Sequence, residues 1–103
     1  MDLDRVDLSG KICLVAEGGR HNPIFTGYWG HCQINNSLEQ YSYRITFSEV
    51  AKLVPGECTS ANLRFKFGTI NELGITIKIG DELQLNEGRR NIGSLKVSKI
   101  YFH

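Results

Sequence analysis

Few residues in this chain could carry out nucleophilic chemistry. A catalytic cysteine or serine needs a histidine base close by, and the histidines are His21, His31 and His103. His31 directly precedes Cys32. Adjacent side chains on a strand point to opposite faces of the sheet. We therefore expect a buried Cys32 beside an exposed His31, and no catalytic pair.

Nucleotide and metal chemistry lack their motifs as well. A phosphate-binding loop needs the pattern G-x-x-x-x-G-K-[ST] between a strand and a helix, and the sequence does not contain it. Cys13, Cys32 and Cys58 are widely spaced and form no C-x-x-C pair. We therefore expect neither a zinc site nor a disulfide framework. The chain is predicted to have no enzymatic activity, no metal and no cofactor.

Two polar segments concentrate glycine with arginine, Glu17 to Pro23 and Glu87 to Asn91. Glycine allows a ligand to approach the backbone, and the arginine guanidinium offers planar donors to phosphate oxygens. Composition alone favours the simpler interpretation, which is a pair of solvated hairpin loops. Trp29 follows the first segment. We expect it to fill the core, and the alternative is an exposed stacking platform.

A β structure must position these residues, because the dominant hydrophobic period is two. Clear alternation spans residues 41–47, 63–67, 75–79 and 83–86, and further strands are predicted at 11–16, 25–34 and 92–102. About six or seven short strands separated by turn residues are typical of a barrel or a sandwich. The residues predicted to point inward are Ile45, Phe47, Phe65, Phe67, Ile77, Leu83 and Val97.

The composition fits one small domain. The chain has 103 residues and a net charge of +1, so no global charge attracts it to nucleic acid or to lipid. Its first residues lack the apolar run of a signal peptide, and no segment approaches the roughly 20 apolar residues of a membrane span. We expect a cytoplasmic protein in which residues 1–9 are a loose lead-in and residues 10–103 form the domain.

Three motifs resemble the third domain of bacterial elongation factor Tu. The family pattern E-G-G-R-H-x-P-x-F-x-G-Y corresponds to Glu17–Tyr28. Residues 53–57 resemble its hydrophobic pair before P-G-D, and residues 86–93 and 97–100 resemble R-E-G-G-R-T-V-G and V-x-K-I. The match covers about residues 11–101 in the same order. The resemblance implies a six-stranded antiparallel barrel with Greek-key connections and a role in translation.

In that family the domain grips the T-stem backbone of aminoacyl-tRNA and contacts the exchange factor and the GTPase domain. Position by position, the resemblance assigns binding roles to Arg20, His21, Tyr28, Glu87 and Gly88. The family's R-P-Q is replaced here by residues 29–31, a threonine by residue 40, and a glycine by residue 89. The full set of predicted binding residues is Arg20, His21, Tyr28, Trp29, His31, Gln40, Glu87, Gly88, Arg89 and Arg90.

Two functions are compatible with this pattern, both for a non-catalytic module that stands alone. The first is binding to a protein partner, namely the exchange factor, a GTPase domain or a toxin that docks on the elongation factor. The near-neutral charge and the altered face around Trp29 favour it. The alternative is binding to a tRNA T-stem through both arginine-bearing loops, which are expected at one end of the barrel. A positive face across those loops would favour RNA, and an exposed apolar patch around Trp29 a protein.

Overall fold

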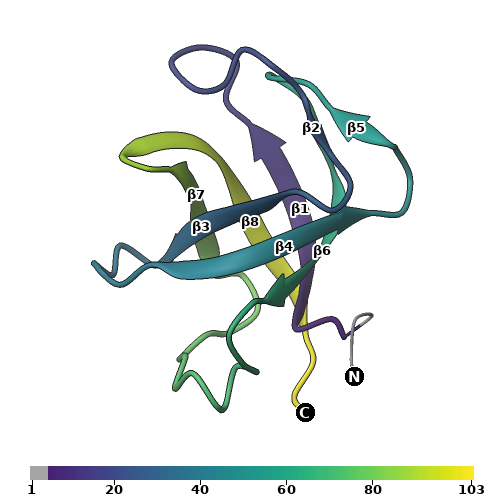
Figure 1. Cartoon of the computed structure of the whole chain (residues 1–103). Coiled ribbons are helices and arrows are strands. Elements are labelled where there is room, and N and C mark those ends of the chain that lie inside the picture. Colours follow the sequence, from purple (N-terminus) through teal and green to yellow (C-terminus); the bar gives the residue numbers. More distant parts are fainter. Residues whose placement is uncertain (1–4) are drawn as a thin grey trace.

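The computed structural model describes residues 5–103, and all regular structure in that range is β-strand (Figure 1). The strands are β1 (Leu8–Leu14), β2 (Ile24–Phe25), β3 (Trp29–Ile34), β4 (Tyr41–Phe47), β5 (Lys52–Leu53), β6 (Cys58–Phe65), β7 (Glu82–Glu87) and β8 (Arg90–Ile100). Six of them form a closed barrel in the order β1–β6–β4–β3–β7–β8, while β2 pairs only with β5. The predicted all-β barrel is confirmed.

The connections of the barrel follow a Greek key. β3, β4 and β6 are consecutive antiparallel neighbours, and β1 pairs with β6 rather than with β3. This arrangement, in which three strands form a meander and a fourth lies beside its far edge, is the Greek-key pattern. β8 then pairs with both β7 and β1 and closes the barrel.

Alternation along the strands fills the barrel interior. Ile45 lies opposite Leu63 across β4 and β6, and both side chains are fully buried. Phe65, Leu83 and Val97 are buried as well. The inward direction of Ile45, Phe65, Leu83 and Val97 is therefore confirmed, and the hydrophobic period of two was sufficient to predict it.

The same alternation fails where β6 ends. Phe67 was predicted to point inward, but β6 stops at Phe65 and the Phe67 side chain is 74% exposed. Phe47, the last residue of β4, is only partly buried and packs on the outside of the core cluster. A period of two carries no information about where the backbone leaves the sheet, so these two end positions could not be assigned from it.

Residues 75–79 do not form the predicted strand. Every strand of the closed barrel already has two neighbours, so no edge is free to accept another strand. The connection from β6 to β7 instead turns across one end of the barrel (Figure 1), where Ile70 and Ile75 are buried and Ile77 is partly buried. A capping box starts this connection, because Thr69 and Glu72 accept hydrogen bonds from each other's backbone N–H groups. Ile77 was predicted to point inward and does pack against the core cluster, whereas Ile79 is 66% exposed and the predicted strand is wrong.

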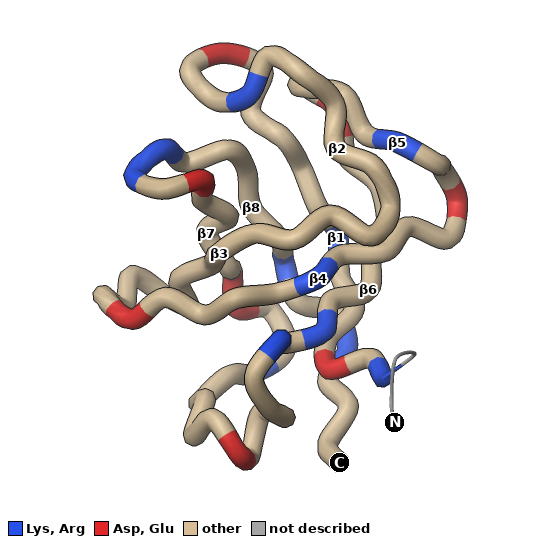
Figure 2. The backbone as a smooth tube through the Cα atoms, in the orientation of Figure 1, with Lys and Arg blue, Asp and Glu red and all other residues tan. Residues whose placement is uncertain are grey.

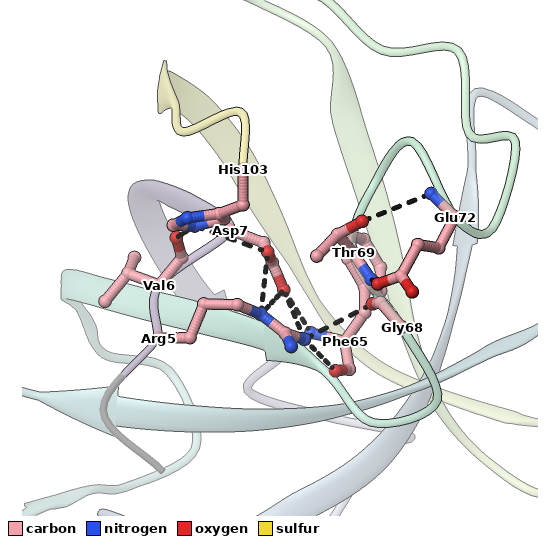
Figure 3. Close-up of polar contacts among 8 residues, drawn as sticks. All are labelled: Arg5, Val6, Asp7, Phe65, Gly68, Thr69, Glu72 and His103. Carbon is pink, nitrogen blue, oxygen red and sulfur yellow. Dashed lines mark hydrogen bonds and ion pairs between the residues drawn. The ribbon is translucent and has the colours of Figure 1, made fainter. Parts of the chain in front are cut away.

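The barrel also begins earlier than the predicted boundary at residue 10. β1 starts at Leu8, and the side chain of Asp7 is fully buried. Its carboxylate accepts hydrogen bonds from the backbone N–H of Phe65 at 2.9 Å and from the Arg5 guanidinium at 3.2 Å (Figure 3). A buried carboxylate requires such partners, so residues 5–9 are part of the domain. The rest of the predicted lead-in, residues 1–4, lies outside the described residues.

The C-terminal residues complete this cluster. The ring of His103 lies with Nε2 2.8 Å from the carbonyl oxygen of Val6 (Figure 3). In addition, the Tyr101 N–H donates to the Asp7 carbonyl oxygen at 2.9 Å. Arg5 adds a bond from Nη2 to the Phe65 carbonyl oxygen at 2.8 Å. The two ends of the described chain are thus joined to each other and to the end of β6.

Cys13 and Cys58 form a disulfide, which corrects the expectation that no such bond exists. The two residues are directly opposite each other on β1 and β6, with Cα atoms 4.1 Å apart. Spacing along the chain could not reveal this pair, because the two cysteines are 45 residues apart in sequence. Cys32, in contrast, is a buried free thiol beside an exposed His31, as predicted.

Removing the disulfide should destabilise the barrel. Replacing both Cys13 and Cys58 with Ser should lower the free energy of unfolding by about 2–4 kcal/mol, because the unfolded chain regains the entropy of an open loop. Urea denaturation followed by circular dichroism measures the difference. Reductant should lower the stability of the parent protein but not that of the variant. Equal stability of the parent protein with and without reductant would contradict the prediction.

Candidate functional site

The two arginine-bearing loops meet at one end of the barrel. The first connects β1 to β2, and the second is the turn between β7 and β8 (Figure 1). The Arg20 guanidinium forms an ion pair with the Glu87 carboxylate and lies 5.2 Å from the centroid of the Tyr28 ring. The Tyr28 hydroxyl donates to the same carboxylate at 2.6 Å. The loops therefore lie together as expected, and Glu87 joins them.

A tight turn places Glu87 in this position. Glu87 pairs with Arg90 across β7 and β8, which leaves Gly88 and Arg89 as a two-residue turn. Gly88 has a φ of 60°, in the left-handed region that favours glycine. Glycine at the first turn position is typical of a type II′ hairpin. Glu87 is thus held by the strand ladder, and its carboxylate faces the first loop.

The charges of these loops are used largely within the protein. Arg20 is paired with Glu87, and Arg90 donates to the Gly19 carbonyl oxygen at 3.3 Å. Burial, followed by the hydrogen bond to Glu87, raises the pKa of Tyr28 well above its usual 10.0, so the phenol keeps the proton that it donates. The loop arginines therefore hold the two loops together, and a phosphate would have to displace these contacts to reach Arg20.

A cleft of about 340 Å³ lies next to this network. It is lined by Tyr28, Trp29, Gly30, His31, Ser42, Lys66, Asn86, Glu87 and Gly88. Five of the predicted binding residues therefore line one cleft. Arg89 and Arg90 line a separate hollow beside Glu87, while Gln40 lies in the exposed connection between β3 and β4. His21 is exposed on the first loop.

A buried hydroxyl lies beneath this cleft. Tyr43 on β4 is fully buried, and its hydroxyl has no hydrogen-bond partner among residues 5–103. A Cβ on Gly30 would lie 2.7 Å from that oxygen, so only glycine leaves room for the phenol. Burial raises the pKa of Tyr43 above its usual 10.0. The predicted site residues did not include this group, and the glycine after Trp29 was the signal that could have found it.

Trp29 is not a core residue, as had been expected, but an exposed one. Its side chain is 44% exposed at the start of β3. Three cations surround its ring, with Arg44, Arg64 and Lys66 at 5.8, 5.6 and 5.2 Å from the ring centroid. The hydrophobic pattern could not decide whether Trp29 points inward or outward. β3 begins at Trp29, and the irregular segment before it gives no alternation from which the direction could be read.

Strand register explains why these side chains meet. Trp29 lies opposite Arg44 across β3 and β4, and Arg44 lies opposite Arg64 across β4 and β6. Lys66 follows two residues after Arg64, and Figure 2 shows blue segments on β4 and at the end of β6. We call Trp29, Arg44, Arg64 and Lys66 the cationic row. The sequence pattern placed Arg44, Arg64 and Lys66 on outer faces. Only the strand register shows that they lie side by side.

The remaining chemistry of the described residues is limited. Burial raises the pKa of the Cys32 thiol to about 12, so it carries no nucleophilic thiolate at neutral pH. Within residues 5–103, no group of three potential metal-ligating side chains is found. No helix in that part of the chain is long and apolar enough to cross a bilayer.

The Arg20–Glu87–Tyr28 network generates a prediction about loop order. Replacing Glu87 with Gln should remove the ion pair and lower the free energy of unfolding by about 1 kcal/mol, because the pair is partly exposed. Amide hydrogen exchange in residues 18–22 should become faster. The matched control is Glu49→Gln, an exposed residue outside this network. Equal exchange in both variants would show that the pair does not order the loop.

No protein-family model matches the chain, and a search of curated proteins found no match. The likeness to the third domain of elongation factor Tu therefore stays a proposal, supported by the three motifs and compatible with the barrel.

Proposed function

We propose that this chain is a non-catalytic binding domain and that it binds an anionic partner through the cationic row. The observation that supports it is the exposed Trp29 ring, with Arg44 and Lys66 at 5.8 and 5.2 Å from its centroid. Strand register produces this arrangement, because Trp29 lies opposite Arg44 across β3 and β4. An anionic partner is the natural complement of such a cationic face.

The environment of Arg44 supports this proposal further. Its Nε atom is buried and has no hydrogen-bond partner in the described part of the chain. Within the same residues, no carboxylate is found within ion-pair distance of Arg44 or Lys66. Their contacts with the Trp29 ring are cation–π interactions, which hold the cations in place without neutralising them. Among residues 5–103, neither of these two charges is therefore neutralised by a carboxylate.

The proposal moves the binding surface away from the loops that the resemblance selects. Arg20 and Arg90 have partners inside the protein, whereas the cationic row lies on the sheet face next to the cleft. Tyr28, His31, Glu87 and Gly88 form the rim of that cleft. A role in translation remains compatible with this surface, but the proposal depends on the charges and not on the resemblance.

A protein partner is the second candidate. Trp29 is a half-exposed aromatic side chain beside a cleft of about 340 Å³, and such residues anchor many protein interfaces. The surrounding cations then require an acidic partner surface, because an apolar surface would leave three charges without water.

Binding to polyanions tests the proposed function. Trp29 is the only tryptophan, so its fluorescence reports on this face directly. Polyuridylate and polyglutamate should both be titrated at several salt concentrations. Replacing Arg44 and Lys66 with Gln should weaken binding about tenfold or more and flatten the salt dependence. For polyuridylate the slope should fall by about 0.7 for each phosphate that the variant no longer neutralises.

The control variant has the same net charge. Lys52 and Lys78 are exposed lysines outside the row, and replacing both with Gln should change binding less than twofold. If both double variants lose affinity equally, net charge and not the row determines binding. If neither polyanion binds the parent protein, the proposed function is wrong.

A further inference from the structure

We infer that the partner of this face is an unpaired nucleic-acid strand that runs from Trp29 across Arg44 and Arg64 to a second cation pair, Lys11 and Lys96. This inference rests on the proposed function and adds to it a second site, a ligand class and a path. The path crosses β3, β4, β6, β1 and β8, which are consecutive neighbours in the barrel wall when β7 is left out.

The second cation pair repeats the feature that defines the first. Lys11 and Lys96 lie directly opposite each other on β1 and β8, and both are exposed. Among the described residues, neither is found in an ion pair. The barrel wall thus carries a second pair of exposed cations, which can contact the backbone of an anionic strand.

Two connected hollows lie between these pairs. The first, of about 260 Å³, is lined by Arg5, Val6, Arg44, Thr46, Asn62, Leu63 and Arg64. The second, of about 570 Å³, is lined by Ser9, Gly10, Lys11, Ser48, Ser60, Ala61, Asn62, Ile79, Gly80, Lys96, Val97 and Ser98. Asn62 lines both, so the two hollows are adjacent at that residue. Neither lining contains an aspartate or a glutamate.

The dimensions fit a short strand. Arg64 and Ser60 are four residues apart on β6, and Ser60 lies opposite Lys11. At the rise of an extended strand, the two cation pairs are therefore separated by roughly 14 Å. Trp29 lies two strands further along, at roughly 5 Å per strand. A strand of about four to six nucleotides spans this distance, within the site sizes of small β-barrels that bind single strands.

The chemistry of the path distinguishes an unpaired strand from the other polyanions. A base can stack on the exposed Trp29 ring only if it is not already paired in a duplex. Hydroxyl and amide groups of Ser9, Ser60 and Asn62 line the path between the cations, and such groups bind sugar hydroxyls and base edges. An acidic polypeptide offers no planar base for Trp29.

Acidic residues of the described chain also lie near the path. Asp81 follows Gly80 of the second hollow, and its carboxylate accepts a hydrogen bond from the Lys78 N–H at 2.8 Å. Asp7 is fully buried and paired with Arg5 behind the first hollow. Glu82 lies opposite Lys96 on β7, on the side away from β1. The surface between Trp29 and Lys11 therefore contains no exposed carboxylate among the residues that line the two hollows.

A length series tests the path. Uridine and deoxythymidine oligonucleotides of two to eight residues should be titrated against the parent protein, with quenching of Trp29 fluorescence as the readout. Affinity should rise about tenfold or more from two to six nucleotides and then level off, because the longer strands reach Lys11 and Lys96. The two sugar types separate RNA from DNA as the natural source.

Two variants locate the ends of the strand. Replacing Lys11 and Lys96 with Gln should weaken binding of the six-residue strand about tenfold and leave the two-residue strand unchanged. Replacing Trp29 with Leu removes the fluorescent reporter, so binding of this variant is measured by isothermal titration calorimetry alongside the parent protein. It should bind both strands about tenfold more weakly, the size expected when one base no longer stacks on an aromatic ring. Circular dichroism checks that both variants keep the β fold. A duplex of equal charge should bind more weakly than the single strand.

The failures of the two proposals can be told apart. If the Arg44 and Lys66 double variant binds polyanions like the parent protein, the proposed function itself is wrong. If that variant is impaired but affinity does not depend on strand length, the path to Lys11 and Lys96 is wrong. Tighter binding of the duplex or of polyglutamate would overturn the inference of an unpaired strand and leave the anionic partner in place.

Discussion

The close approach of β1 and β8 is the constraint on which the rest of this structure depends. Closing six strands into a barrel brings these two backbones together. A Cβ at Gly10 would lie 2.0 Å from the Lys96 carbonyl oxygen, and a Cβ at Gly93 would lie 2.3 Å from the Cys13 carbonyl oxygen. Both distances are far too short for a real side chain. Gly10 and Gly93 therefore permit β1 and β8 to pair this closely. The register of this pair shifts between Ser9 and Gly10.

Closure has consequences for both faces of the wall. Because no strand of the closed barrel has a free edge, the long connection between β6 and β7 covers one barrel end instead of adding a strand. In the closed barrel Arg44 lies opposite Arg64, and Lys11 lies opposite Lys96. The filled interior and the disulfide at Cys13 contribute to the stability of the barrel.

More of the fold than of the site could be predicted from the sequence. Alternation was enough to predict a barrel or a sandwich and to direct residues such as Ile45 and Leu83 inward, because burial of one face depends only on local order along a strand. The choice of a six-stranded barrel came from the resemblance. The disulfide and the cationic row depend on which strands become neighbours, and no local pattern reports that. The loops around Arg20 and Glu87 were recognised by resemblance, but their mutual ion pair, which changes what Arg20 can do, required the structure.

The contact between His103 and Val6 bears on how the protein can be rearranged. Because the ring of His103 lies within hydrogen-bond distance of the Val6 carbonyl oxygen, a short peptide linker can join the two ends without crossing the barrel. New termini can then be opened at the exposed connection between β3 and β4, which lies outside the two hollows. A chain permuted in this way keeps every barrel pairing while it changes the order in which the strands are synthesised. The domain is thus suited to insertion into a loop of a host protein, with the sheet face that carries the cationic row left uncovered.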